Sequence, residues 1–82
     1  MKIRNKKYGN MNMIGQRVEL LRKEKQIKQK DFISQLQVEG LDINPTSYSK
    51  LEGQIRIASD KEVFYIAKVL GVNIEKLFEK CD

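Results

Sequence analysis

The chain has 82 residues, enough for a single domain, and carries 16 Lys and Arg against 11 Asp and Glu, a net charge of +5. It has no histidine, which excludes the common zinc sites and histidine-assisted nucleophiles, so we expect neither an enzyme nor a metal or other cofactor. No stretch reaches the roughly 18–20 apolar residues of a membrane span. The single cysteine, Cys81, cannot form an intrachain disulfide, and a lone thiol is typical of the reducing cytoplasm.

The first twelve residues differ from the rest of the chain in charge and composition. They hold Gly9, three asparagines and four basic side chains without any acidic one, the basic residues being Lys2, Arg4, Lys6 and Lys7. Residues 1–12 are therefore predicted to be a flexible basic arm, and residues 13–82 to form the folded domain. A basic arm indicates a polyanionic partner, although a short basic tail can equally well serve solubility alone.

Beyond the arm, apolar residues recur at helical spacing in five short blocks. Ile14, Val18 and Leu21 follow an i, i+4, i+7 pattern, which predicts a first helix. A second helix is predicted over residues 29–38, because its apolar positions repeat in the same way until Gly40 interrupts the pattern.

Strong start and stop signals mark a third helix. Asn44 is a preferred N-cap residue, and Pro45 suits the first helical position, where no backbone N–H is needed. Gly53 is expected to end this helix. Tyr48 and Leu51 are three residues apart and are predicted to face the core.

Two further helices complete the pattern. Ser59 and Glu62 have the spacing of a capping box at the start of a fourth helix, which Gly71 ends. Asn73 is predicted to cap a short fifth helix that carries Leu77. Because no segment shows the alternation of a β-strand, the predicted fold class is all-α, a compact bundle of five short helices.

The exposed side of the third predicted helix is polar and has no acidic residue before its last position. It presents Thr46, Ser47, Ser49 and Lys50. A helix fits the major groove of DNA, where hydroxyl groups and lysine hydrogen-bond to base edges. For an isolated helix, however, simple exposure to solvent is the commoner explanation of such a face. The choice between a DNA-binding face and a merely solvated one therefore depends on the neighbouring segments of the sequence.

Four segments of the chain, taken in order, resemble the phage-repressor and Cro type (Xre type) of helix-turn-helix proteins. They are residues 14–18 (IGQRV), 29–32 (QKDF), 48–52 (YSKLE) and 66–73 (IAKVLGVN). The resemblance spans about residues 14–78. It implies a lambda-repressor-like domain that binds a specific sequence of double-stranded DNA in the cytoplasm and regulates transcription, as a repressor.

The resemblance also implies which residues contact DNA. The side chains expected to contact bases are Thr46, Ser47 and Lys50, and those expected to contact phosphates are Lys28, Gln29, Asn44 and Arg56. Arg22 and Glu52 match a pair that joins the first and third helices. We therefore expect a partly buried ion pair there, which orients the third helix and does not itself contact DNA.

The sequence departs from the family pattern around the third helix. The segment 37–43 is longer than the usual connection between the second and third helices, and Ile33 stands where a small residue is common. Both changes imply that the third helix is shifted, or propped away from the second helix. Pro45 replaces a residue that often reads a base, and Gln54 occupies the usual position of a glycine, so the following loop is expected to differ too.

The DNA sequence specificity that a single helix can supply indicates whether the protein acts as a monomer or a dimer. Two or three base contacts at about 1–3 kcal/mol each fall short of the ~4–10 kcal/mol that separates specific from non-specific sites. We therefore expect a weak homodimer, or a dimer formed on DNA, at a palindromic operator, with Ile74, Leu77 and Phe78 as candidate contacts. The alternative function is a protein-interaction module of the same fold, such as an antitoxin or a partner-binding regulator. Salt-dependent DNA binding separates the two functions.

Overall fold

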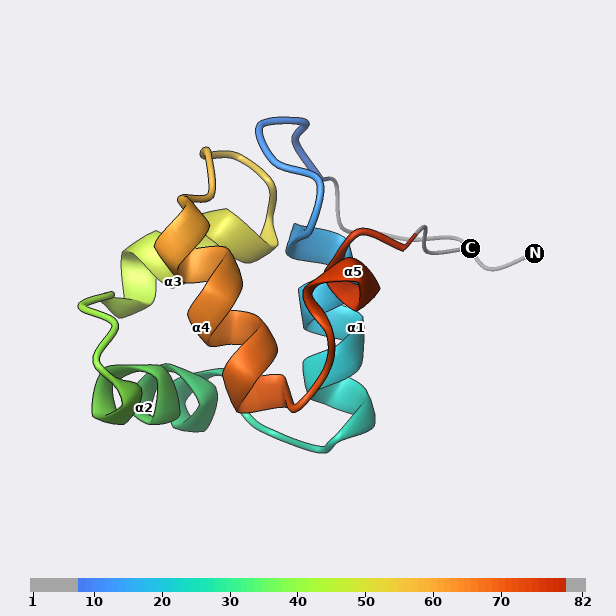
Figure 1. Cartoon of the computed structure of the whole chain (residues 1–82). Helices are drawn as coiled ribbons and strands as arrows, with labels where there is room; N and C mark the ends of the chain where they lie inside the picture. The colour runs from blue at the N-terminus through green and yellow to red at the C-terminus, as the bar shows by residue number, and fades with distance from the viewer. Residues whose placement is uncertain (1–7, 80–82) are drawn as a thin grey trace.

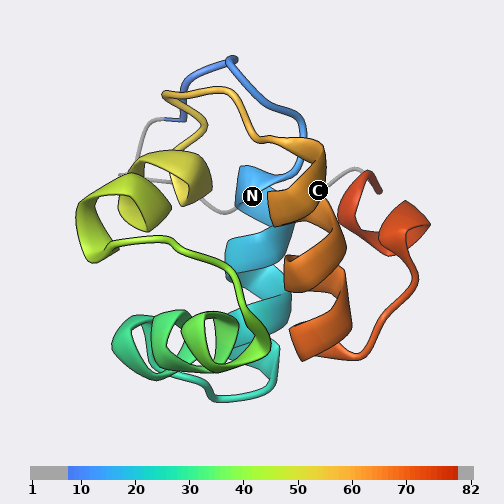
Figure 2. The same cartoon turned by 60° about the vertical axis from the view of Figure 1, so that its left-hand side comes forward.

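A computed structural model describes residues 8–79 of the chain. These residues form five helices: α1 (Gly15–Glu24), α2 (Gln29–Glu39), α3 (Pro45–Glu52), α4 (Asp60–Leu70) and α5 (Ile74–Leu77). The predicted all-α class, a compact bundle of five short helices, is confirmed. In Figures 1 and 2, α3 and α5 lie on opposite sides of the bundle with α4 between them. No helix within the described range is long and apolar enough to cross a bilayer.

Local capping signals set the ends of the helices as the sequence predicts. Asn44 caps α3 by accepting a hydrogen bond from the helix backbone, and Pro45 occupies the first turn. Both reciprocal hydrogen bonds of the capping box between Ser59 and Glu62 are present at the start of α4. Gly71 ends α4 in the left-handed conformation, with φ at 72°, which glycine adopts without steric cost.

The core lies where the apolar stripes of the helices meet. Because these stripes recur every three or four residues, each helix turns one face inward and leaves its polar face exposed. The buried apolar side chains are Ile14, Val18, Leu21, Phe32, Ile33, Leu36, Leu41, Ile43, Tyr48, Leu51, Ile66, Ala67, Leu70 and Leu77.

Part of the long connection predicted between the second and third helices is helical. α2 continues to Glu39, and Gly40 then ends it in the left-handed region with φ at 115°. The next two apolar residues, Leu41 and Ile43, are 7% and 3% exposed. The additional residues therefore anchor the start of α3 in the core and do not loop out into solvent.

Residues 8–13, here called the N-terminal strap, lie against the loop that follows α3. The backbone N–H groups of Gly9 and Met11 donate to the carbonyl oxygens of Gly53 and Gln54, at 2.8 and 2.9 Å. Residues 8–12, which the sequence assigns to the basic arm, thus make backbone hydrogen bonds to the folded domain. The four basic side chains of the predicted arm lie outside the described residues.

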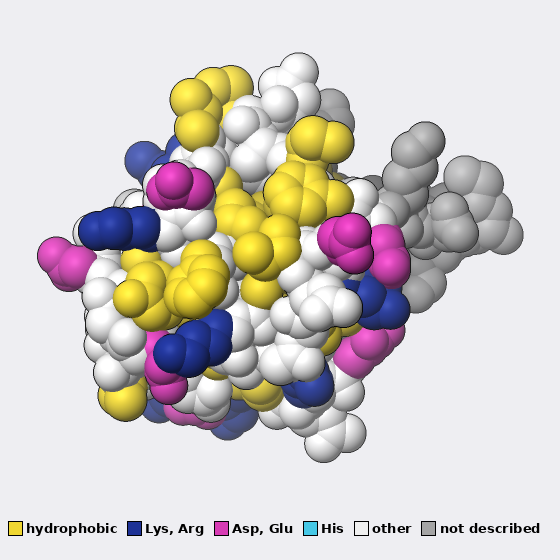
Figure 3. Space-filling view, in the orientation of Figure 1, with side chains coloured by type: hydrophobic (Ala, Val, Ile, Leu, Met, Phe, Trp, Pro, Cys, Tyr) yellow, Lys and Arg dark blue, Asp and Glu magenta, His cyan; other side chains and the backbone are white. Residues whose placement is uncertain are grey.

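Several large apolar side chains remain at the surface around α4 and α5. Phe64, Ile74 and Phe78 are 52%, 44% and 45% exposed. Figure 3 shows hydrophobic side chains gathered in the middle of the face on which α4 and α5 lie. Leu77 is completely buried, so of the residues expected as dimer contacts it belongs to the core, whereas Ile74 and Phe78 are available at the surface.

Candidate nucleic-acid interface

Five of the seven side chains predicted to contact DNA lie around one shallow hollow. Its lining consists of Asn44, Pro45, Thr46, Ser47, Lys50 and Arg56. Thr46 and Lys50 are exposed and lie one helical turn apart, so they project from the same face of α3. The fold thus brings the polar half of α3 and the loop after it onto one surface.

The acidic residue of α3 is removed from this surface. Glu52 is the only acid in the helix and is completely buried. Its carboxylate accepts hydrogen bonds from Nε of Arg22 at 2.7 Å and from Nη2 of Arg22 at 3.2 Å. The predicted ion pair between the first and third helices is confirmed. As a consequence, Lys50 is the only charged side chain that α3 presents to solvent.

Further donors complete this buried cluster. The Tyr48 hydroxyl donates to Glu52, and so does Nε2 of Gln29, at 3.2 Å. Burial alone lowers the pKa of Arg22, but the hydrogen bonds and negative charge of Glu52 outweigh it and raise the pKa overall. Burial, together with the same carboxylate, raises the pKa of Tyr48. Arg22 is therefore charged and Tyr48 neutral, and the cluster joins α1, α2 and α3 through one carboxylate.

Gln29 and Lys28 sit at the start of α2, near the C-terminal end of α3. The side-chain amide of Gln29, predicted to contact a phosphate, is directed inward to Glu52. Lys28 is exposed and provides no side-chain cap, so the first backbone N–H groups of α2 are not capped by a side chain at this position. One acid, Asp31, lies in the same turn. Lys28 and the backbone N–H groups at this end of α2 are therefore better placed than the Gln29 amide to bind an anion.

Arg56, also predicted to contact a phosphate, has partners within the protein. Its guanidinium donates to the carbonyl of Ser47 at 2.9 Å and to that of Ile57 at 2.7 Å. Two more hydrogen bonds, at 2.9 and 2.7 Å, reach the carboxylate of Glu62. Burial by itself raises the pKa of Glu62, but the hydrogen bonds from Arg56 and from the backbone of Ser59 lower it overall. Arg56 therefore ties α3 to the start of α4, and its charge is largely neutralised.

Asn12 of the N-terminal strap is a residue that the sequence analysis missed. Its side-chain N–H group donates to the carbonyls of Leu51 and Arg56 at 3.0 and 2.9 Å. Its side-chain oxygen accepts from the backbone N–H groups of Ile14 and Gly15 at 3.1 and 2.8 Å. One amide therefore caps α1 and holds the end of α3. The sequence offers one signal for the first role, since asparagine before an apolar repeat favours capping.

The loop after α3 contains a residue other than glycine in the left-handed conformation. Gln54 adopts the left-handed conformation with φ at 60°, at the position where the resemblance favours glycine. Its side chain donates to the backbone carbonyl of Asn12 at 2.6 Å. This contact adds to those between the N-terminal strap and the loop.

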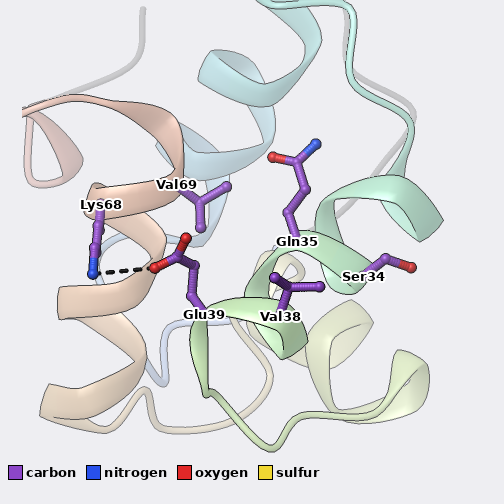
Figure 4. A pocket seen from close by; sticks show the side chains of 6 residues that line it. All are labelled: Ser34, Gln35, Val38, Glu39, Lys68 and Val69. Carbon is purple, nitrogen blue, oxygen red and sulfur yellow. Dashed lines mark ion pairs between the residues drawn. The ribbon is translucent and has the colours of Figure 1, made fainter.

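A second hollow lies between α2 and α4, away from the α3 surface (Figure 4). It is lined by Ser34, Gln35, Val38, Glu39, Lys68 and Val69, and an ion pair of 3.1 Å joins Lys68 to Glu39. The two charges neutralise each other, so this hollow does not concentrate positive charge. Within residues 8–79, no three His, Cys, Asp or Glu side chains gather in a way that suits a metal ion.

Comparisons of this chain with protein-family models, with curated proteins and with solved structures find no match. A function for this chain is therefore supported by its own residues and contacts. Of the two hollows described above, the one beside α3 combines the side chains predicted to contact bases with a surface lysine, Lys50, that forms no ion pair within residues 8–79.

Proposed function

We propose that this protein binds a specific sequence of double-stranded DNA and regulates transcription, as a repressor, in the cytoplasm. In this proposal α2 and α3 act as a helix-turn-helix and α3 enters the major groove. The observation that carries the proposal is the surface of α3, where Thr46, Ser47 and Lys50 lie together while the only acid of the helix, Glu52, is buried. Burying that acid removes the repulsion it would exert on DNA phosphates.

Base contacts and phosphate contacts fall to different residues in this proposal. Lys50 and Thr46 hydrogen-bond to base edges, with Ser47 beside them. Lys28 and the first N–H groups of α2 bind a phosphate, because a helix start favours an anion. Asn44 lines the same surface, and because its side-chain oxygen accepts from the backbone N–H of Ser47, its amide N–H group is the part that can donate to a phosphate. Bound protein then represses by occluding the promoter, which requires no covalent chemistry.

The second candidate function is a protein-interaction module of the same fold. The exposed Phe64, Ile74 and Phe78 favour it, because half-exposed apolar side chains of this size often mark a contact surface. The two functions differ in their response to salt. DNA binding weakens steeply as salt rises, since phosphate contacts release counterions, whereas apolar protein contacts do not weaken in this way.

The test begins with selection of bound sites from random double-stranded DNA, followed by fluorescence anisotropy on the selected site. Lys50→Ala is expected to weaken binding by about 1–3 kcal/mol and to relax the preference at one base position. Lys76→Ala, which removes an exposed lysine of α5 on the far side of the bundle, is the matched control and is expected to bind nearly as well as the wild type. Equal affinities and equal base preferences for the two variants would contradict the role of α3.

A further inference from the structure

Two segments that lie side by side carry four exposed apolar side chains. The N-terminal strap carries Met11 and Met13, which are 50% and 74% exposed. The loop after α3 carries Ile55 and Ile57, which are 58% and 68% exposed, and backbone hydrogen bonds join the strap to this loop. They are four of the nine exposed large apolar side chains in residues 8–79, so nearly half of these groups lie on two short segments. We call these four side chains the strap–loop face.

The polar residues between these apolar side chains are directed into the protein. Asn12, between the two methionines, donates to the carbonyls of Leu51 and Arg56. Arg56, between the two isoleucines, is bound to Ser47 and Glu62. Two polar side chains are thus held inward while the apolar residue on each side of them is left in water, which is the reverse of the usual arrangement. The polar contacts therefore keep the strap–loop face exposed.

The strap and the loop after α3 form one end of the molecule. Figures 1 and 2 show both segments beyond the ends of the helices, with α2 at the opposite end. Apolar side chains on such a projection can enter the boundary between lipid headgroups and acyl chains, about 5–10 Å deep, without any movement of the helices.

The chemistry of the strap–loop face suits lipid better than a specific protein. Specific protein contacts depend mostly on Trp, Tyr and Arg, whereas this face consists of two thioether and two aliphatic side chains. The guanidinium of Arg56, the only charged group in residues 53–58, is already bound to Glu62. Side chains of this kind gain free energy by leaving water but do not distinguish one partner from another. Acyl chains provide such an environment.

The charge next to the strap–loop face suits an anionic surface. Residues 1–13 contain four basic residues and no acidic one. Lys7, the last of the four, is four residues before Met11, so their Cα atoms are at most about 14 Å apart. At the other segment, the carbonyl of the exposed Lys50 accepts from the backbone N–H of Ile55 at 3.0 Å. Each cation near an anionic lipid surface strengthens binding about fivefold.

We propose that the strap–loop face inserts into the surface of a bilayer that contains anionic lipids. The contact is weak and reversible, since even a single inserted acyl chain binds a membrane only reversibly. Arg56 lies between the two isoleucines and also lines the hollow beside α3, so a bilayer at this face excludes DNA from α3. The membrane contact does not depend on the proposed function, whereas the exclusion of DNA rests on it.

The first test is sedimentation of the full chain with lipid vesicles in the absence of DNA. The protein is expected to bind vesicles of phosphatidylcholine mixed with phosphatidylglycerol about tenfold or more tightly than vesicles of phosphatidylcholine alone. Ile57→Asp is expected to weaken binding to the mixed vesicles about tenfold or more, because it replaces an inserted apolar side chain by a charge. Met13→Gln, which adds no charge, is expected to weaken it about fivefold.

Val38→Asp is the matched control for Ile57→Asp. It places the same charge at an 85% exposed valine of α2, at the other end of the molecule, and is expected to bind mixed vesicles nearly as tightly as the wild type. A wild type that does not bind mixed vesicles, or equal weakening by the two aspartate variants, would overturn the proposed contact.

A fluorescence measurement tests the orientation and does not rely on a weakened variant. The chain contains no tryptophan, so a single introduced indole reports on one position. The emission of Ile57→Trp is expected to shift to shorter wavelength on mixed vesicles, because the indole leaves water, whereas that of Val38→Trp is expected to stay unchanged. Equal shifts at both positions, or a shift only at position 38, would show that another face meets the bilayer.

A second copy of the chain is the other occupant that the measurements must separate. Sedimentation equilibrium of lipid-free protein is expected to give the same molecular mass for the wild type and for Ile57→Asp. Self-association of the wild type that Ile57→Asp abolishes would assign the strap–loop face to a contact between copies and overturn the lipid contact.

The exclusion of DNA is tested with the selected site and fluorescence anisotropy. Mixed vesicles are expected to displace the wild type from DNA, whereas Ile57→Asp is expected to bind the same DNA and to resist displacement. Simultaneous binding of DNA and vesicles would refute the exclusion and leave the membrane contact intact. Loss of DNA binding in Ile57→Asp would assign the face to the DNA interface instead. Failure of the wild type to bind any selected site would refute the proposed function and leave the vesicle results unaffected.

Discussion

Glu52 determines both the position and the charge of α3. A carboxylate at the end of an exposed helix would ordinarily lie in water and repel DNA phosphates. Here Arg22, Gln29 and Tyr48 surround it with hydrogen bonds, so its charge is neutralised inside the protein. The ion pair was predictable from the sequence, whereas the contributions of Gln29 and Tyr48 depended on where α2 and α3 meet.

At the scale of single residues, we predict a large loss of stability for Arg22→Ala. Glu52 would remain completely buried without a cation, so the free energy of unfolding is expected to fall by roughly 3–5 kcal/mol. The free energy of unfolding is measured by urea denaturation monitored by circular dichroism. Lys23→Ala on the same helix is the control, because Lys23 is 64% exposed in its pair with Glu19 and should cost only about 0–1 kcal/mol. Similar losses for both variants would show that the buried pair has no special role.

At the scale of elements, the start of α4 serves two purposes. Glu62 closes the capping box with Ser59 and also binds the guanidinium of Arg56 through both carboxylate oxygens. The capping signal was visible in the sequence because its residues are three positions apart. The second interaction of Glu62, with Arg56, depends on the loop after α3, which folds back so that Arg56 reaches the start of α4.

The lowered pKa of Glu62 predicts a pH dependence of stability. A carboxyl group whose pKa is lower in the folded state stabilises the protein above its ordinary value of about 4.5, and this stabilisation is lost as the pH falls through the lower, folded value. The free energy of unfolding is thus expected to decrease below about pH 4.5. Glu62→Gln, which preserves a capping-box residue, is expected to make this decrease smaller.

Chemical unfolding at a series of pH values tests this prediction. Glu75→Gln at the exposed surface of α5 changes the net charge equally and serves as the control. If Glu62→Gln and the wild type lose stability in parallel below pH 4.5, the interaction of Glu62 with Arg56 contributes little.

At the scale of the whole molecule, the N-terminal strap joins parts of the chain that are far apart in sequence. Asn12 caps α1 and binds the carbonyls at the end of α3 and in the following loop. Gly15 permits α1 to come close to α3 at this point, since a Cβ there would lie only 2.3 Å from the carbonyl oxygen of Leu51. The placement of α3 relative to α1 therefore depends on the strap as well as on the ion pair.

We predict that Asn12→Asp separates the two roles of this side chain. A carboxylate still accepts from the start of α1, but it cannot donate to the carbonyls of Leu51 and Arg56. Two lost hydrogen bonds are expected to cost about 1–3 kcal/mol of unfolding free energy, and affinity for DNA should fall because α3 is held less firmly. Asn10→Asp, at an exposed position of the same strap, makes the same charge change and should have little effect on either quantity.

Thermal unfolding and fluorescence anisotropy, applied to both asparagine variants, measure the two effects. A loss of stability common to both variants would assign it to added negative charge. A loss confined to Asn12→Asp without any change in DNA affinity would limit Asn12 to a structural role.

The sequence by itself determined the five helices, their order and their inward faces, because periodicity and capping act over three to eight neighbouring residues. It also indicated the Arg22–Glu52 pair and the polar face of α3, the former through resemblance and the latter through composition. These features are local, or follow from which face of a helix is apolar.

Only the tertiary structure decided how the polar side chains pair. Gln29 turns inward to Glu52, Arg56 binds Glu62, and Asn12 reaches the end of α3. Gln29 and Asn12 have partners far along the chain, and the partner of Arg56 lies across a turn whose path no local signal predicts. Polar side chains gain little from a specific partner in water but must find one when they are buried. Their roles were therefore set only when the helices came together.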